Sequence, residues 1–100
     1  MVTIQNYVRA KSLEEAYELN QKKGNCILGG MLWTKMQNRM IQTAIDLCDL
    51  GLNEIEETEE EFSIGAMVSL RQLETDTGLN AYTQGAVRDA VKDIVGVQFR

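Results

Sequence analysis

The chain has 100 residues and a mass of 11.3 kDa, enough for one modest hydrophobic core, and its formal net charge is −5. It has no histidine, which excludes His-dependent nucleophiles and His-ligated metal sites, and its two cysteines are too few for a Cys₄ zinc or iron–sulfur site. Residues 51–100 hold four Lys/Arg against ten Asp/Glu, and no apolar run approaches the roughly 20 residues that span a bilayer. These counts predict a soluble acidic domain with no nucleic-acid and no membrane partner.

The first predicted elements are two short extended pieces, at 2–4 and 7–9, and a helix that runs to about Lys23. Ser12 and Glu15 are spaced as a capping box, in which a hydroxyl and a carboxylate satisfy free backbone N–H groups at a helix start. One face of this helix gathers three side chains: Leu13, Ala16 and Tyr17.

Two buried strands should follow this helix. Cys26–Leu28 is a continuous apolar run, typical of a strand buried on both faces, and Thr43–Leu47 repeats that pattern. Between them we expect a turn or short helix over Met31–Gln37, with Met36 and Met40 filling the core. Strand, helix and strand within about 45 residues predict a small βαβ-type unit.

The second half predicts a strand hairpin. Ile55 begins one strand, and Phe62, Ile64 and Ala66 alternate on one face of the next. The acidic turn between them lacks the Asp/Asn alternation and the glycine of a calcium loop, so we interpret it as a solvated turn and not as a cation site. Its glutamates are Glu54, Glu56, Glu57, Glu59, Glu60 and Glu61.

Two helices complete the predicted α+β fold, a small α/β unit followed by a strand hairpin and helices. Ser69 and Gln72 form a second capping box, which opens a short helix ending near Thr77-Gly78. Apolar residues at helical spacing predict an amphipathic helix over residues 83–95 with Gly96 as its C-cap. Residues 97–100 begin a further segment with no closing element, so we expect the chain to be part of a larger subunit.

The two cysteines bear on the compartment. Cys26 and Cys48 lie in apolar stretches, and the N-terminal ten residues show no apolar segment of a signal peptide. We interpret the cysteines as reduced core thiols of a cytoplasmic protein, with a disulfide as the alternative.

One short motif could bind a ligand. The strand ending at Leu28 runs directly into Gly29-Gly30, and successive N–H groups in such a turn can form a nest for an anion such as a diphosphate. The motif is neither the Walker pattern nor GxGxxG, and a plain turn is the alternative.

Five motifs in chain order favour a ligand-binding role for Gly29 and Gly30 over a plain turn. They are Ser12–Ala16, Leu28–Trp33, Ile45–Leu47, Ile64–Ala66 and Gln98–Arg100. In this order the chain resembles the FAD-binding (medium) subunit of the molybdenum hydroxylases, the xanthine dehydrogenase and carbon monoxide dehydrogenase family. Its usual elements are Ser-Leu-Glu-Glu-Ala, Ala-Gly-Gly-Thr-Asp-Leu, Ile-Asp-Leu, Ile-Gly-Ala and Gln-Ile-Arg-Asn. The resemblance covers nearly the whole chain.

The resemblance implies an incomplete FAD-binding fold of the PCMH-like type, with a first subdomain at 1–58 and the start of a second at 59–100. It implies FAD as cofactor in the full-length subunit. Electrons would come from an iron–sulfur subunit, which a molybdopterin subunit supplies, and would pass to NAD or another acceptor. The residues implied in cofactor binding are Leu28, Gly29, Gly30, Met31, Leu32, Trp33, Ile94 and Val95.

Two departures from the family limit this reading. The polar pair that usually follows Gly-Gly is Met31-Leu32 here, so only backbone donors remain for the phosphates. Trp33 could stack on a ligand or pack in the core, and we expect packing. The family's second glycine loop is missing, so we expect weak or no FAD binding by this chain alone. We assign no catalytic residue and no metal ligand; the alternative function is a small protein-interaction domain without flavin, with Gly29 and Gly30 buried by packing.

Overall fold

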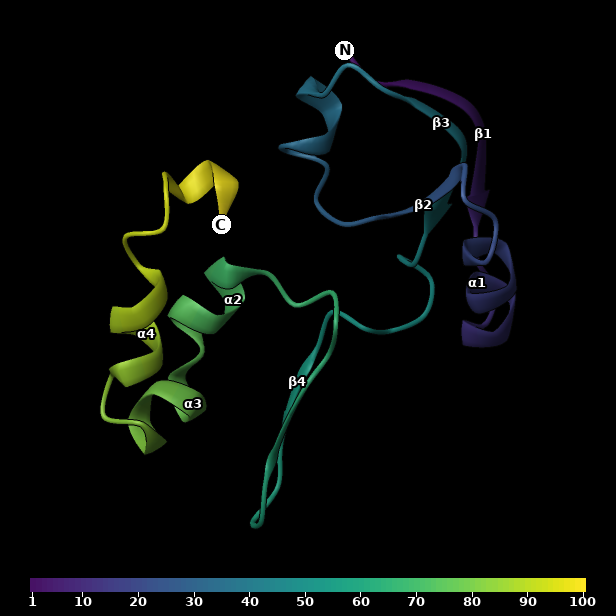
Figure 1. The fold of residues 1–100 in the computed structure, drawn as a ribbon. Helices are drawn as coiled ribbons and strands as arrows, with labels where there is room; N and C mark the ends of the chain where they lie inside the picture. The colour runs from purple at the N-terminus through teal and green to yellow at the C-terminus, as the bar shows by residue number, and fades with distance from the viewer. The chain divides into compact units, whose positions relative to one another are not determined.

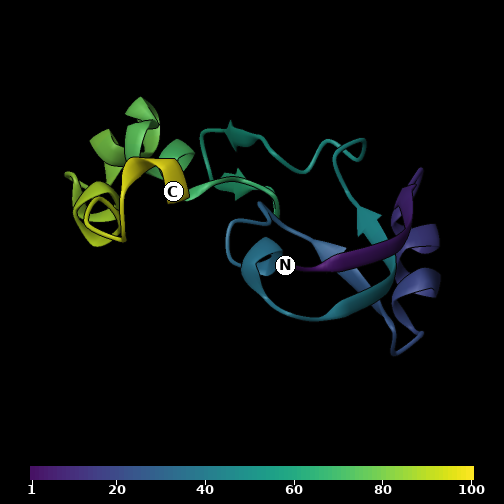
Figure 2. The same cartoon turned by 90° about the horizontal axis from the view of Figure 1, so that it is seen from above.

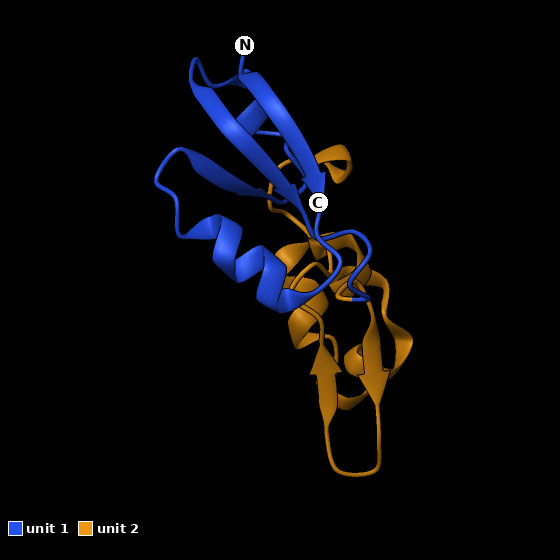
Figure 3. Cartoon of the chain, turned by 90° about the vertical axis from the view of Figure 1, so that its right-hand side faces the viewer, with its two compact units in different colours: residues 1–51 blue, residues 52–100 orange.

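The computed structural model describes all residues, 1–100, and divides into two compact units, residues 1–51 and 52–100 (Figure 3). The division falls after Gly51, whose φ of 66° is a left-handed conformation that glycine adopts without steric cost. The assignment of the subdomains to 1–58 and 59–100 stays a prediction.

Unit 1 is a three-stranded parallel sheet with one helix. The strands are β1 (Thr3–Arg9), β2 (Asn25–Leu28) and β3 (Met40–Asp46), in the order β1-β3-β2. Helix α1 (Leu13–Asn20) connects β1 to β2 and contacts both β2 and β3 (Figures 1 and 2). The predicted βαβ-type unit is therefore present, with β1 as one continuous strand where two short pieces were expected.

The strand order decides which strand is buried. β3 lies in the centre, and its Ile41, Ala44 and Ile45 are completely buried. β2 lies at an edge, and Ile27 keeps 39% of its surface exposed. The prediction of a strand buried on both faces is therefore wrong for β2, because a short apolar run does not distinguish an edge strand from a central one.

Helix α1 starts at the predicted residue but buries a different face from the one predicted. The Ser12 hydroxyl accepts from the Glu15 N–H at 3.1 Å, but the Ser12 N–H does not donate back to the Glu15 carboxylate. Ala16 and Leu19 face the core with Ile45, whereas Leu13 and Tyr17 are mostly exposed. The helix ends at Asn20, three residues before the expected Lys23, so it is shorter than the sequence suggested.

Unit 2 pairs an antiparallel hairpin with three short helices. The hairpin is β4 (Ile55–Glu57) with β5 (Phe62–Ile64), and its acidic turn is exposed as expected. The helices are α2 (Leu70–Thr75), α3 (Thr77–Tyr82) and α4 (Ala86–Val91), and α2 packs against α4 (Figure 1). The mixed α+β fold class, a small parallel sheet followed by a hairpin and helices, is confirmed.

The predicted helix over 83–95 is wrong in length. Gln84 and Gly85 have φ values of 55° and 82°, and this left-handed pair separates α3 from the six-residue α4. The Asp76 side chain caps α3 by accepting from the Leu79 N–H at 2.9 Å. Helix α3 therefore starts where the helix predicted from Ser69 was expected to end. An apolar spacing of 3.6 residues cannot show such a break.

The last residues are fixed by Arg100. A short 3₁₀ turn at Val97–Phe99 precedes it, and its guanidinium contacts the Glu74 carboxylate at 2.8 Å. Gly96 is extended, with φ −79°, and Val95 adopts the left-handed conformation with φ 45°. The predicted glycine C-cap is therefore wrong, and the segment expected to lack a closing element is held in place.

Several residues expected in the core are at the surface. Cys48, Met36 and Met40 are exposed, Cys26 is half-buried, and neither cysteine forms a disulfide. No group of three or more Cys, Asp or Glu side chains is placed to hold a metal ion. None of the helices has the length and apolar character needed to cross a membrane.

Candidate cofactor site

The glycine loop leaves the sheet at its carboxyl edge. All three strands are parallel, and the register places Arg9 and Leu28 on either side of Asp46, the last residue of β3. Gly29 and Gly30 follow Leu28 directly, so the loop begins where the three strands end. In open parallel sheets this edge is where ligands bind.

Nothing inside the chain requires Gly29 and Gly30 to be glycine. Both are exposed, a Cβ atom built on either meets no heavy atom within 4 Å, and neither has a positive φ. Gly65 shows the opposite situation, since its Cβ would overlap the Leu52 carbonyl. The missing side chains at Gly29 and Gly30 leave space for a group from outside the chain to approach the backbone.

Four successive N–H groups in this loop have no partner within the chain: those of Gly29, Gly30, Met31 and Leu32. Met31 has φ 62°, and its carbonyl accepts from the Lys35 N–H at 2.9 Å, which closes the following turn. A left-handed residue within a run of free N–H groups is the geometry of an anion-binding nest. The loop can therefore donate several hydrogen bonds to phosphate oxygens.

Met31 has a structural role that its sequence did not reveal. Its side chain packs against the buried cluster of Leu28, Ile41 and Ala44. A left-handed non-glycine residue costs roughly 1–2 kcal/mol, which this packing offsets. The neighbouring Leu32 is half-buried, and Trp33 is 60% exposed, so the expected packing of Trp33 in the core is wrong.

The loop lies in an acid-free part of the sequence. Between Glu18 and Asp46 there is no Asp or Glu, while four cations are present: Lys22, Lys23, Lys35 and Arg39. These cations do not surround the loop: Lys22 and Lys23 precede β2 and Arg39 precedes β3, at the amino edge of the sheet, whereas the loop leaves the carboxyl edge beside Asp46.

A network of polar side chains occupies the same carboxyl edge. The Tyr7 hydroxyl donates to the Asp46 carboxylate, whose other oxygen accepts from the Cys48 N–H at 2.9 Å, and Arg9 forms an ion pair with Asp49 at 2.6 Å. The bond from Tyr7 holds the pKa of Asp46 below its ordinary value and raises the pKa of Tyr7. Desolvation raises the pKa of the Cys48 thiol, which is therefore neutral near pH 7. Sequence reasoning missed this network because it joins residues about 40 positions apart.

The two remaining predicted residues, Ile94 and Val95, lie in unit 2 just beyond α4. Both side chains are largely exposed, at 43% and 49%. Arg100 donates to both carbonyls, at 3.3 and 2.8 Å, and pairs with the nearly buried Glu74. The structure thus brings residues 28–33 together in one loop and places Ile94 and Val95 in the other unit, and their joint contact with a cofactor stays a prediction.

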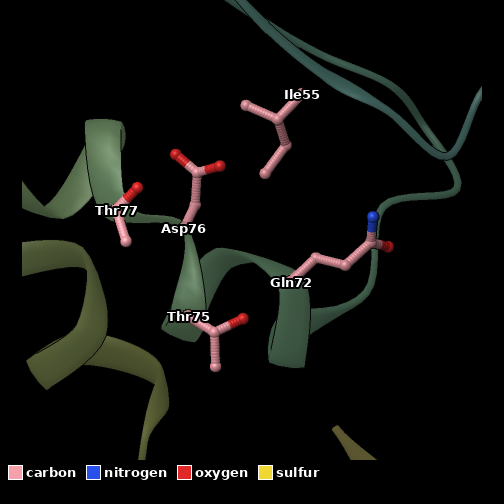
Figure 4. Close-up of a pocket in the computed structure, with 5 residues that line it drawn as sticks. All are labelled: Ile55, Gln72, Thr75, Asp76 and Thr77. Carbon is pink, nitrogen blue, oxygen red and sulfur yellow. The ribbon is translucent and has the colours of Figure 1, made fainter.

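A polar pocket of about 320 Å³ in unit 2 is a competing site (Figure 4). Its polar side chains already serve the fold. Gln72 caps α2 and donates to the Asn53 carbonyl at 2.7 Å, the Thr75 hydroxyl donates to the Arg71 carbonyl, and Asp76 caps α3. The pocket therefore offers few free groups to a ligand.

Comparison with known proteins identifies the domain. A family model described as the FAD binding domain in molybdopterin dehydrogenase matches residues 2–100. The chain belongs to this family. FAD is therefore the cofactor of its domain class, and the resemblance stated from the five motifs is confirmed.

A solved structure agrees in fold. A chain of the Cu,Mo-CO dehydrogenase (CODH) crystal structure, in its cyanide-inactivated form, superposes on this FAD domain with a TM-score of 0.78 and 24% identity. The alignment covers 100% of this chain and 37% of the CO dehydrogenase chain. No curated protein matches this chain.

Proposed function

We propose that this chain binds the diphosphate of FAD through the loop Leu28–Trp33, as part of a molybdopterin-dependent dehydrogenase or hydroxylase. The run of four unpaired N–H groups beside two open glycines carries the proposal. The loop offers these donors together with space for the phosphates.

The division of labour follows from what the chain contains. FAD, when bound, supplies the redox chemistry, and the protein binds and orients it. The loop amides of Gly29–Leu32 would hold the diphosphate, and Met31 would fix their orientation through its packing. We assign no catalytic residue, since the site is built from backbone donors and packing side chains.

The rest of the complex is proposed from family membership. An iron–sulfur subunit would deliver electrons from a molybdopterin subunit, and the flavin would pass them to NAD or another acceptor, as in the xanthine dehydrogenase type. The two unbridged cysteines support a reducing, cytoplasmic compartment.

The alternative, a small protein-interaction domain without flavin, would have Gly29 and Gly30 buried by packing. Both are exposed, and neither would contact the chain through a Cβ. The glycines therefore favour the flavin proposal.

The test is a titration of the purified chain with FAD, followed by flavin fluorescence and the visible spectrum. Gly30→Val places a branched side chain where the structure has open space, so we expect the unfolding midpoint to stay and the FAD affinity to fall more than tenfold. Gln37→Val, in an extended position of the same unit, is the matched control and should bind as the wild type does. If the chain alone gives no signal, the same variants are compared for flavin retention in the whole subunit. Full retention by Gly30→Val would contradict the proposal.

A further inference from the structure

The carboxylate of Asp46 is an unusual neighbour for a diphosphate site. It is the last residue of the central strand, beside Leu28, from which the glycine loop departs. A negative charge at this edge does not assist phosphate binding. Some other part of a ligand, or the fold alone, must account for it.

The chemistry of Asp46 matches hydroxyl donors. The hydrogen bond from Tyr7 keeps its pKa low, so the carboxylate is ionised near pH 7 and can only accept hydrogen bonds. Tyr7 and the Cys48 N–H each take one lone pair, one on each oxygen, and hold the group in a fixed orientation. Each oxygen retains capacity for a further donor, and the residue is only half-buried.

The ligand has one suitable group close to its diphosphate. In a nucleoside diphosphate a ribose with two vicinal hydroxyls is attached directly to the phosphate. In one class of parallel α/β sheets, the dinucleotide-binding fold with the GxGxxG motif that this chain lacks, a carboxylate about 20 residues after the glycine turn accepts from this diol. A diphosphate on the amides of Gly29–Leu32 and a diol on Asp46 would use two adjacent strand ends of one sheet.

We propose that Asp46 accepts hydrogen bonds from the ribose hydroxyls of the adenosine half of FAD, oriented by Tyr7. This inference rests on the proposed function, because it needs the diphosphate on the glycine loop. It places the ADP half of the cofactor on unit 1 and gives the loop specificity for a ribonucleotide over a simple anion.

The test uses ADP as the probe, so that no other part of the flavin contributes. The ¹⁵N-labelled chain is titrated with ADP and with 2′,3′-dideoxy-ADP, and the dissociation constants are read from the amide shifts. For the wild type, removing the hydroxyls should weaken binding about tenfold, the effect of losing a hydrogen bond to a charged acceptor. For Asp46→Asn, ADP should bind about tenfold more weakly, and the two nucleotides should then bind nearly alike.

If Asp46 contacts the ribose hydroxyls, replacing it removes the difference in affinity between ADP and 2′,3′-dideoxy-ADP. If Asp46 only supports the fold, that difference stays. Asp49→Asn is the matched control, since it makes the same change of charge three residues away in an exposed ion pair, and it should keep the full difference between the nucleotides. If Asp46→Asn does not fold, Tyr7→Phe replaces it and should reduce that difference. An undiminished difference in these variants would overturn the assignment of Asp46 while ADP binding upheld the diphosphate site. If the wild-type chain alone shows no ADP-dependent shift, ADP and 2′,3′-dideoxy-ADP are compared on the whole subunit freed of flavin, and absence of ADP binding there would reject both.

Discussion

Gly65 offers the sharpest test of how this fold is held together. A Cβ on Gly65 would lie 2.5 Å from the Leu52 carbonyl carbon, closer than real side chains come, and it would overlap the carbonyl oxygen. The obstacle is backbone, so the chain itself must move. The two hydrogen bonds at risk tie the base of the hairpin together: Gly65 N–H to Glu54 O at 3.0 Å and Met67 N–H to Leu52 O at 2.8 Å.

The magnitude for Gly65→Ala follows from these contacts. Overpacking costs about 1–3 kcal/mol, and weakening two hydrogen bonds adds about 1–2 kcal/mol. We therefore expect unfolding to become easier by about 2–5 kcal/mol, a large share of the roughly 5–15 kcal/mol of a typical domain.

The assay is urea unfolding followed by far-UV circular dichroism. Gly30→Ala is the matched control, because its Cβ meets nothing within 4 Å. The control should change the free energy of unfolding by less than about 1 kcal/mol. The change should be towards higher stability, because alanine restricts the backbone of the unfolded chain more than glycine does. Equal unfolding curves for Gly65→Ala and the wild type would refute the steric argument, and a large loss for Gly30→Ala would refute the view that its space is open.

Three other predictions concern unit 2. Asn80 donates to the carbonyls of Leu73, Glu74 and Asp76 and accepts from the Arg88 N–H, so Asn80→Ala should cost about 2–4 kcal/mol in urea unfolding, and an unchanged midpoint would contradict this. The hydrogen bond from Arg100 holds the pKa of Glu74 below its ordinary value of 4.5, so the ion pair stabilises the fold above that value and is lost as the pH falls through the lowered pKa. Glu74→Gln should therefore have a lower Tm than the wild type at pH 7, and the difference in Tm should disappear in acid. A difference in Tm that persists in acid would contradict the pairing. Val95 is β-branched with φ 45°, so Val95→Gly should raise stability by about 1 kcal/mol in thermal unfolding, and a loss of similar size would show that the residue is not strained.

Local signals were predictable because they depend on neighbours in the chain. The capping box of Ser69 and Gln72 forms as the spacing requires, with both bonds present at 2.9 and 3.1 Å. The hairpin from Ile55 also forms, with Phe62 and Ile64 alternating with a polar residue after the polar turn. The motif of Leu28 and two glycines was found in the same way, as a strand followed by a flexible turn.

Other features were decided only by tertiary contacts. Whether Leu13 or Leu19 faces the core depends on where α1 meets the sheet, which the helical spacing leaves open. The conformation of Met31 depends on the cluster into which its side chain packs.

The sequence by itself determined the order of most elements, though not the separate helix α3, and the class of cofactor and the position of the glycine loop, because these follow from local propensities and from motifs in register. The tertiary structure decided that the loop amides stay unpaired, that Tyr7 reaches Asp46 and that Arg100 reaches Glu74. The physical reason is that the two side-chain contacts join groups 39 and 26 residues apart, whose meeting is set by strand order and packing and not by spacing along the chain.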